Sequence, residues 1–565
     1  MRTRLLSVLV GGVVIVASCE TVTPSSAPPE TRQLGLAAQQ VLRVDISGEP
    51  PTLDPTRAEG GGEITVLKAL HRSLVGLDER LEVVPALAQS WDVSADAKTL
   101  TFHLRDAHYS NGDPIVAADF VSSWKRLADP RTQAPYSYVM AEVEGAPELL
   151  GMDPENPPSD AEIDAALERL GIEAPDARTL VVHLNSPATY FLSALTLWVF
   201  APLQEEWITS VDATEAGNHV SSGPFILDSW DHESSIALKP NPHWWGVKPG
   251  LTEIQMSMHG EPAQAQLAYD AGELDIVVVP AGDVERIRND PGLAAEYGEV
   301  NWLGVSFLAF NNYQDPGLAS FADPGPTKNK DFRIALTQAI DKQALIDATQ
   351  AGLGRVANSI VMPGIPGHQP DLNPYPYDLD SAREHMNTAL AALGVGSAAE
   401  LGELRFGYAT ERGFEPGAAF LAEAWRSAFG VEFDEITSDI GVFSTQKAAG
   451  EYDIARGGWL ADFPHAHNQL DGLFTCGGGL NDGQYCNTTF DEFVAQAAAE
   501  PDADSQQALY EEAQTVLMRD AGFLPLEFAV TPYMVKPHVS GLTVTPAFSK
   551  VPGDDFYETV HILDQ

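Results

Sequence analysis

Apolar and polar positions follow two different periods along residues 41–565. Short runs in which every second residue is apolar predict β-strands. They cover residues 41–46, 99–104 and 180–184. Longer runs with apolar residues three and four positions apart predict amphipathic helices. They cover residues 66–74, 119–127, 332–343, 344–350 and 501–519. Short strands interspersed with amphipathic helices indicate an α/β fold.

Two segments interrupt this pattern. Residues 150–175 hold an acidic helix between turn residues, which is typical of a surface insertion. Residues 361–380 combine prolines and glycines with aromatic residues, and we expect a long ordered loop there. Residues 41–565 are too many for a single hydrophobic core, so we expect two or three domains.

The first residues predict an export signal. Two arginines precede an apolar run over residues 5–17, which is too short to span a bilayer. Small residues then lead directly into Cys19, which resembles the lipobox of bacterial lipoproteins. We expect residues 1–18 to be a signal peptide and Cys19 to carry a lipid that anchors the protein to the cell membrane. The alternative is an ordinary secretory signal with an incidental cysteine. Residues 19–40 are rich in Pro, Ser, Ala and Gln and predict a flexible tether.

The composition is strongly acidic. Asp and Glu number 80 against 33 Lys and Arg, for a formal net charge of −47. Such a charge argues against binding nucleic acid or an anionic membrane by electrostatics. Because the acids are spread along the whole chain, they favour a solubilising surface in salty surroundings over attraction of cationic ligands.

Two cysteines remain beside Cys19. Cys476 and Cys486 flank a loop of Gly, Asn and Asp residues. Outside the cytoplasm a disulfide between them is plausible. A metal site is the alternative, but no histidine lies close to them in the sequence.

The most informative motif places one cation and one anion six residues apart. Arg456 and Asp462 enclose Gly457, Gly458 and Trp459. Side chains six apart on a strand share a face, about 20 Å apart when fully extended. A glycine pair that bends the strand would shorten this to about 10 Å, the span of about three extended residues. Arginine binds a carboxylate and aspartate binds an ammonium, so this pattern suits a free peptide. A core strand that ends in a surface salt bridge is the alternative.

The sequence contains none of the common hydrolase or nucleotide-binding motifs. The glycine runs at 60–62 and 477–479 lack the Lys and Ser/Thr that bind phosphate. His465 and His467 are two apart in a proline-bounded segment, where we expect solvent-facing side chains and not a metal site.

A tryptophan pair lies in the middle of the chain. Trp244 and Trp245 follow an Asn-Pro turn. We expect them to pack within a lobe, and a platform that stacks on a sugar ring is the alternative.

Several segments, taken in order, resemble the extracytoplasmic solute-binding proteins of peptide-importing ABC transporters (bacterial solute-binding protein family 5). They are EPPTLDP (49–55), PALAQSW (85–91), TFHLR (101–105), SNGDP (110–114), SGPF (222–225), NPHWW (241–245), DFRIAL (331–336) and the Arg456–Asp462 segment. Each match is weak by itself, but their order and spacing extend through nearly all of residues 41–565.

The resemblance implies an α/β fold of the two-lobed periplasmic-binding-protein type (type II, a Venus flytrap) with an additional small inserted domain. Lobe I would comprise residues 41–75, 190–305 and 530–565. The inserted domain would comprise 76–189, and lobe II 306–529. The ligand would lie between the lobes, which close around it by a hinge motion.

The resemblance also implies the binding residues. Asp462 matches the residue that binds a peptide ammonium, and Arg456 matches one that meets the carboxylate of a tripeptide. Gly458 and Leu460 match positions whose main chain pairs with the ligand as an added strand, with Trp459 between them. Gly61 and Tyr136 match, respectively, an opposing main-chain contact and a tyrosine that lines the site.

Three positions depart from the family pattern. The oligopeptide-binding branch has a disulfide at positions that match Phe307 and Leu460, so that bridge is absent here. An aromatic platform matches Ile440, which is aliphatic. The pair Cys476 and Cys486 instead resembles a loop disulfide of the dipeptide-binding branch.

We therefore predict a non-catalytic, monomeric, lipid-anchored protein without cofactor or metal. It would bind short peptides outside the cytoplasm, at the cell surface or in the periplasm, and deliver them to a permease with cytoplasmic ATPases. The alternatives are the same role for a sugar oligomer or a metal chelate, and a secreted hydrolase. Arg456 would keep Asp462 ionised, which does not suit a general acid or base.

Overall fold

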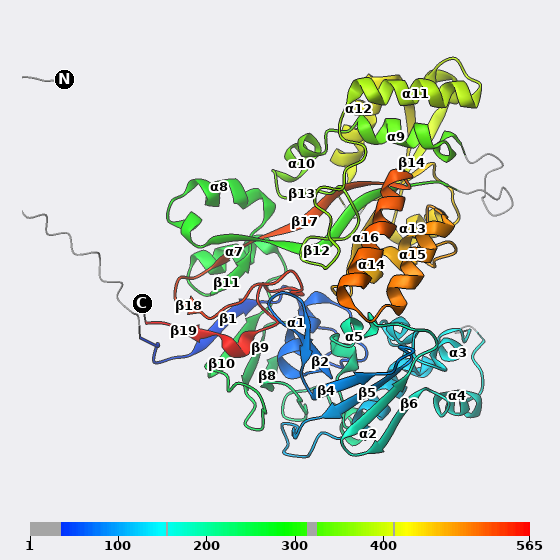
Figure 1. Cartoon of the computed structure of the whole chain (residues 1–565). Helices are drawn as coiled ribbons and strands as arrows, with labels where there is room; N and C mark the ends of the chain where they lie inside the picture. The colour runs from blue at the N-terminus through cyan, green and yellow to red at the C-terminus, as the bar shows by residue number, and fades with distance from the viewer. Residues whose placement is uncertain (1–34, 154–155, 313–324, 411–412, 565) are drawn as a thin grey trace, which may run out of the picture.

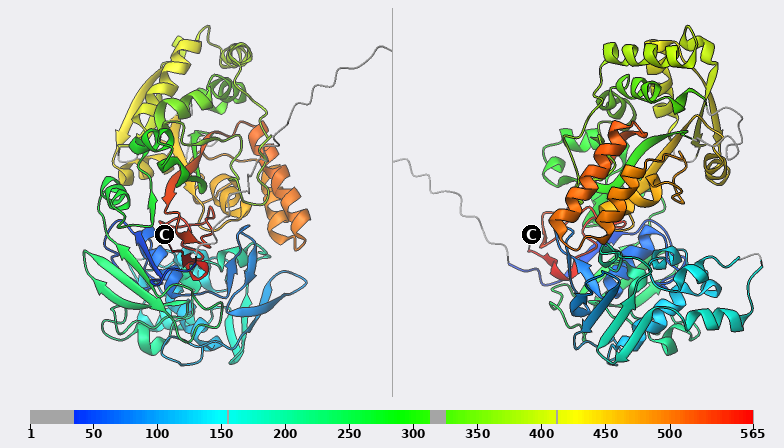
Figure 2. Two further views of the ribbon diagram at one scale, coloured as in Figure 1. Left: turned by 90° about the vertical axis from the view of Figure 1, so that its left-hand side faces the viewer. Right: turned by 45° about the vertical axis from the view of Figure 1, so that its right-hand side comes forward.

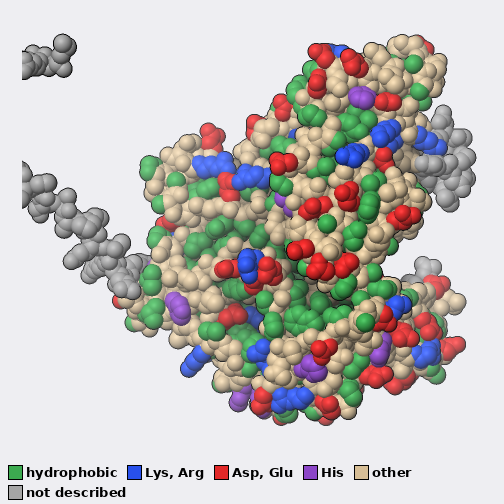
Figure 3. Space-filling model, in the orientation of Figure 1, with side chains coloured by type: hydrophobic (Ala, Val, Ile, Leu, Met, Phe, Trp, Pro, Cys, Tyr) green, Lys and Arg blue, Asp and Glu red, His purple; other side chains and the backbone are tan. Residues whose placement is uncertain are grey.

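The computed structural model describes residues 35–153, 156–312, 325–410 and 413–564. They form two bodies, one above the other in Figure 1, with a hollow between them that the space-filling view also shows (Figure 3). One body also lies above the other in both further views (Figure 2). We name the lower body the lower lobe and the upper body the upper lobe.

The lower lobe contains a sheet with the strand order β1-β10-β9-β8. β1 and β10 are parallel, and the other pairs are antiparallel. These strands are β1 (Val41–Asp45), β8 (Phe225–Asp231), β9 (Ser235–Pro240) and β10 (Glu253–Ser257). Around them lie α1 (Gly61–Leu70), α5 (Phe191–Ala194), α6 (Glu205–Ile208), β2 (Val75–Leu77), β3 (Val83–Pro85), β18 (Val539–Ser540) and β19 (His561–Ile562).

An antiparallel sheet with the order β4-β5-β7-β6 lies at one side of the lower lobe (Figure 1). It comprises β4 (Ala88–Val93), β5 (Thr99–Leu104), β6 (Ile172–Asp176) and β7 (Thr179–His183), with α2 (Ala117–Ala128), α3 (Ala146–Leu150) and α4 (Asp160–Leu167) beside it. Its buried residues belong to the same hydrophobic cluster as those of the first sheet. The two sheets therefore share one core.

The upper lobe is built on a mixed sheet with the order β11-β17-β12-β16-β14-β15, and β13 also pairs with β17. Its strands are β11 (Ile276–Val278), β12 (Tyr297–Phe310), β13 (Arg355–Val356), β14 (Glu403–Ala409), β15 (Glu432–Ser438), β16 (Ile454–Leu460) and β17 (Phe523–Val535). Its helices are α7 (Pro262–Asp270), α8 (Val284–Asn289), α9 (Lys330–Gln338), α10 (Lys342–Gln350), α11 (Leu379–Leu393), α12 (Glu415–Phe429), α13 (Ile440–Ala448), α14 (Ala466–Phe474), α15 (Thr488–Ala499) and α16 (Ala503–Arg519).

β12 separates two cores. Its residues Val305 and Phe307 pack into one cluster with α14, α15 and α16, while Leu308 and Phe310 pack into another with α9, α11 and α12. Alternation of side chains between the two faces of a strand produces this division. Both faces of the second half of β12 are therefore covered, and residues 303–310 read as a nearly continuous apolar run.

Most predicted elements exist, with shifted ends. The predicted strand 99–104 has the limits of β5. The helix predicted at 66–74 begins earlier, at Gly61, because the carboxylate of Glu63 accepts the backbone N–H groups of Glu59 and Gly60. It ends at Leu70, since the next residue, His71, is already extended with φ −128° and ψ 158°.

The helices predicted at 332–343 and 344–350 divide elsewhere. α9 ends at Gln338 and α10 begins at Lys342, because Asp341 caps the second helix by accepting the N–H of Ala344 at 3.0 Å. Residues 361–378 contain no helix or strand in the described structure, as expected for an ordered loop. The domain limits drawn from the resemblance stay a prediction.

Candidate functional site

A cavity of about 590 Å³ lies between the two lobes. Its walls come from α1, the β2–β3 hairpin and the segment 546–558 below, and from Leu303 and residues 460–464 above. Hydrophobic side chains line the floor of the hollow in Figure 3, and acidic ones gather along its upper rim. The volume is in the range of about 300–1,000 Å³ that holds small ligands.

Asp462 enters this cavity directly after β16. Its backbone N–H donates to Oδ1 of Asn468 at 3.1 Å, and its Oδ2 accepts from Nδ2 of Asn468 at 3.1 Å. Its Oδ1 accepts from the hydroxyl of Tyr138 at 2.9 Å. Among the described residues, no lysine or arginine lies within ion-pair distance of this carboxylate. Burial raises the pKa of Asp462, and the hydrogen bonds from Asn468 and Tyr138 offset part of that rise.

Tyr136 and Gly61 line the same cavity. The ring of Tyr136 lies edge-on to Trp198, with 4.8 Å between the centroids. Burial, followed by the negative charges of Asp462 and Glu59, raises the pKa of Tyr136 to about 12. Gly61 is the first residue of α1, and a Cβ added there would lie 3.1 Å from the carbonyl oxygen of Ser549.

The glycine pair does not bend β16, which corrects the expectation from the sequence. The strand pairs with β12 in unbroken register from Ile454 to Leu460. The glycines instead allow close packing, because a Cβ at Gly457 would meet the ring of Phe307 at 2.3 Å. A Cβ at Gly458 would approach the guanidinium of Arg456 to 2.9 Å.

The structure gathers only part of the expected set around the cavity. Asp462, Leu460, Tyr136 and Gly61 line it, whereas Arg456, Gly458, Trp459 and Ile440 are not among its lining residues.

Arg456 shares a strand face with Leu460 but lies four residues further from the cavity. Its guanidinium carbon is 4.8 Å from the ring centre of Phe414. Burial raises the pKa of Glu527, and the hydrogen bond from Gln350 and the charge of Arg456 offset part of that rise. Arg456 and Glu527 are therefore close enough to interact electrostatically.

Trp459 and Ile440 lie elsewhere. Trp459 points to the opposite face of β16, and its indole N–H donates to Oδ1 of Asn468 at 2.8 Å. Because Asn468 also binds Asp462, Trp459 holds the aspartate in place indirectly. Ile440 is the first residue of α13 and is 41 % exposed.

The structure adds Trp198, Trp302 and Phe548 to the site, which the sequence did not single out. Aromatic side chains form much of the cavity wall: Trp198, Trp244, Trp245, Trp302 and Phe548. The expected packing of the tryptophan pair exists, since the guanidinium of Arg105 lies 3.6 Å from the ring centre of Trp245. Trp244 and Trp245 are nevertheless also part of the cavity wall. The sequence offered such a role, a platform for a sugar ring, only as the alternative to packing within a lobe.

His465 and His467 are not solvent-facing, which corrects another expectation. His467 is 8 % exposed and stacks on Tyr190, with 3.6 Å between the ring centroids. His465 Nε2 lies 3.1 Å from Oε1 of Gln506. Burial lowers the pKa of His465 to about 4 and that of His467 well below its ordinary value. No cluster of three or more potential metal ligands occurs within the described parts of the chain.

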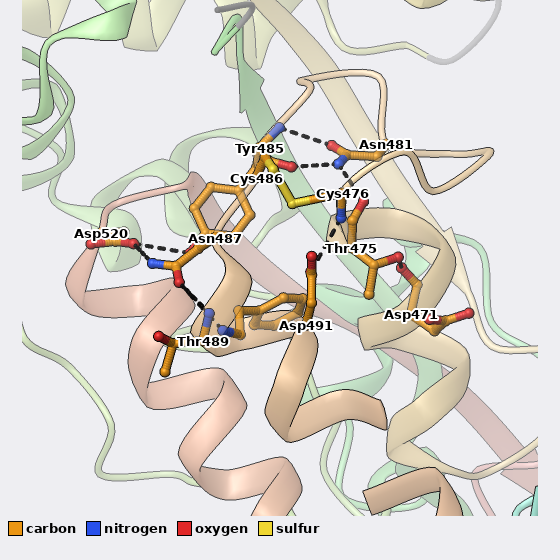
Figure 4. The surroundings of a disulfide bond; sticks show 11 residues. Asp471, Thr475, Cys476, Asn481, Tyr485, Cys486, Asn487, Thr489, Asp491 and Asp520 are labelled. Carbon is orange, nitrogen blue, oxygen red and sulfur yellow. Dashed lines mark hydrogen bonds between the residues drawn. A yellow bond between two sulfur atoms is a disulfide. The ribbon is translucent and has the colours of Figure 1, made fainter. Parts of the chain in front are cut away.

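Cys476 and Cys486 form a disulfide in the loop between α14 and α15 (Figure 4). Asn481 bridges the loop internally, donating to the carbonyls of Thr475 at 2.9 Å and Tyr485 at 2.7 Å. The N–H of Cys476 donates to Asp491 of α15 at 3.2 Å. The loop is thus fixed to the helices on both sides of it.

The sequence model of the bacterial extracellular solute-binding proteins, family 5 (middle region), matches residues 82–481. The chain belongs to this family. The periplasmic murein peptide-binding protein MppA of Escherichia coli K12 is 28 % identical over 518 residues, 90 % of this chain and 91 % of MppA. This family 5 protein therefore resembles its relative over almost the full length of both.

Solved structures agree with this assignment. MppA in its unliganded open form matches with a TM-score of 0.81 and 26 % identity, covering 94 % of this chain and 99 % of that one. The oligopeptide-binding protein OppA of Haemophilus influenzae in complex with the peptide RPPGFSPFR matches with a TM-score of 0.67 and 27 % identity, covering 94 % and 100 %. The fold is therefore the two-lobed type II fold.

None of the helices in the described residues is both long enough and apolar enough to cross a membrane. The expected signal peptide and Cys19 lie outside the described residues.

Proposed function

We propose that this family 5 protein captures short peptides outside the cytoplasm and delivers them to the permease of an ABC importer. The observation that carries the proposal is the carboxylate of Asp462, which faces an interlobe cavity and has no cationic partner among the described residues. A buried carboxylate without a counter-charge favours a cationic ligand group, because pairing recovers part of the desolvation penalty. A peptide α-ammonium is such a group.

The edge of β16 next to Asp462 suits a ligand main chain. β14 pairs with β16 only at Ile454 and Ala455, so residues 456–460 have a sheet partner on the β12 side alone within the described structure. An extended peptide adds to such an edge through main-chain hydrogen bonds. Gly61 lines the cavity from the lower lobe, and we infer that it opposes this edge. This arrangement would recognise the main chain and the ammonium, and tolerate many side chains.

The remaining parts of the proposal rest on the sequence and on the relatives. We infer that residues 41–75, 190–305 and 530–565 form lobe I, 76–189 the inserted domain and 306–529 lobe II. Lobe I and lobe II would close on the ligand by bending within β12 and β17, which cross the proposed limits at 305/306 and 529/530. Lipid on Cys19 would hold the protein beside its permease at the membrane.

Native mass spectrometry of the protein, purified from its expression host, tests the proposal. We expect adducts whose fragments read as short peptides with free termini. Recovery of the same peptides uncleaved after incubation would separate a binding protein from a hydrolase. A bare protein that binds no added peptide would contradict the proposal.

One observation favours a second candidate, a non-peptide solute. The indole rings of Trp244, Trp245 and Trp302 offer flat apolar surface in the cavity wall. Such surfaces stack on sugar rings and other flat ligands. A single non-peptide adduct in the same spectra would identify this case.

A further inference from the structure

Three cationic side chains line the interlobe cavity, and two of them are already paired. Nζ of Lys68 lies 2.6 Å from Asp555, and the guanidinium of Arg72 lies 2.8 Å from Glu558. The third is Lys550. Within the described structure, no carboxylate lies within ion-pair distance of its ammonium. Lys550 is therefore the cavity cation that remains available to a ligand.

The main chain at Lys550 is well fixed. Its N–H lies 3.1 Å from Oγ1 of Thr65 and 3.3 Å from Oδ2 of Asp554, both of which are buried. The Cβ of Lys550 lies 3.6 Å from the position that a Cβ on Gly61 would occupy. The lysine thus projects from a rigid backbone beside the lower-lobe glycine that opposes β16.

The cavity has opposite charges available at different places. Asp462 and Glu59 both act on the phenol of Tyr136, and neither is in an ion pair within the described chain. Lys550 supplies the positive charge beside Gly61. Arg456, which the sequence suggested for the negative end of a ligand, is outside the lining residues. A ligand carboxylate inside this cavity therefore meets Lys550, whereas only a ligand that extends beyond the lining residues reaches Arg456.

We propose that Lys550 binds a carboxylate of the ligand from the lower lobe, and that the protein prefers peptides that carry a carboxylate at this point. The inference rests on the proposed function and specifies its ligand class. The carboxylate is either the C-terminus or an acidic side chain. A lysine is a flexible point charge, so it accepts either without the fixed bidentate geometry of arginine.

Titration calorimetry with three peptides tests the proposal. Trialanine has a terminal carboxylate, trialanine amide has none, and alanyl-glutamyl-alanine amide has only a side-chain carboxylate. Lys550→Met removes the charge and keeps most of the aliphatic length. We expect it to weaken binding of the carboxylate-bearing peptide about tenfold, as for loss of a hydrogen bond to a charged group, and to leave trialanine amide unchanged. The loss of affinity should be smaller in 0.5 M salt, because salt screens a partly exposed ion pair.

Two further variants serve as controls. Lys550→Arg keeps the charge and should retain most of the affinity. Lys248 is exposed in the lower lobe and does not line the cavity, so Lys248→Met should bind all three peptides as the wild type does. Thermal unfolding verifies that each variant folds.

The pattern of losses identifies the carboxylate. A loss confined to trialanine assigns the C-terminus, and a loss confined to the glutamyl peptide assigns a side chain. Equal loss for all three peptides, or no loss for any, would overturn the role of Lys550. In that case, binding of trialanine amide by the wild type would still support the proposed function. Failure of every peptide to bind the wild type would overturn the proposed function itself.

Discussion

The hydroxyl of Tyr138 donates a hydrogen bond to Asp462 at 2.9 Å, and this bond joins the lower lobe to an upper-lobe residue of the cavity wall. Burial, followed by the charge of Asp462, raises the pKa of Tyr138, so the phenol remains a donor at neutral pH. Asn468 holds the other carboxylate oxygen. Two neutral donors therefore orient the carboxylate and leave its negative charge available to a cation.

Asp462→Asn is expected to weaken binding of free peptides by about 2–3 kcal/mol, because it leaves a desolvated ammonium without its counter-charge. Calorimetry with trialanine measures the loss. The unliganded variant should be as stable as the wild type or more stable, since the buried carboxylate lacks a cation there.

The matching ligand control is N-acetyl-trialanine, which has no ammonium. It should bind the wild type weakly, and Asp462→Asn should change its affinity little. If acetylated and free peptides bind equally well, Asp462 is not the ammonium partner.

Arg456→Ala is expected to reduce affinity most for one ligand length, because a fixed cation on β16 meets a terminal carboxylate only when the peptide reaches it. A series of two- to five-residue alanine peptides, titrated into wild type and variant, measures this dependence. The control is Arg383→Ala, at an exposed position on α11. We expect it to leave the affinity unchanged for peptides of every length. Uniform loss across the series would mean that Arg456 serves the structure around Phe414 and Glu527.

Removal of the disulfide should lower the free energy of unfolding by roughly 2–3 kcal/mol, since the bridge closes a short loop in the unfolded chain. The double variant Cys476→Ala/Cys486→Ala, unfolded in denaturant, measures this change. Wild type under a reducing agent should unfold at the same denaturant concentration as the double variant. Unchanged midpoints in both experiments would show that the hydrogen bonds of Asn481 hold the loop without the bridge.

Stability should fall as the pH is lowered from about 6.5 to about 4. Burial lowers the pKa of His465 to about 4, whereas an unfolded histidine titrates near 6.5. In this window the unfolded chain binds a proton that the folded protein excludes, so acid favours unfolding by at most about 1.4 kcal/mol per pH unit. His467 acts in the same direction.

His465→Gln should therefore lose less stability than the wild type between pH 6.5 and 4, as measured by denaturant unfolding at each pH. His243 is exposed, so His243→Gln should keep the wild-type slope. Identical slopes for all three proteins would mean that His465 does not contribute to the acid response.

Local patterns in the sequence predicted much of the fold. The strict alternation of residues 99–104 gave a strand with the correct ends, because one of its faces is buried and the other is not. The end of α1 was missed, since His71 leaves the helix for contacts with the distant Ser222 that no local pattern contains.

The site was harder to predict. Asp462 belongs to a recognisable segment, but its donor Tyr138 lies 324 positions away in the sequence. Lys550 is a single lysine in a loop, and only the folded chain brings it beside Gly61. The glycines of β16 suggested a bend because spacing alone does not show that Phe307 fills the space above Gly457.

The half-paired edge of β16 has a consequence for the solubility of the protein. An exposed strand edge normally invites pairing with the strands of other chains and so promotes aggregation. Here the half-paired edge covers only residues 456–460 and ends at Leu460 in the wall of the interlobe cavity. So short an edge offers little length for a strand of another copy of the protein to pair with.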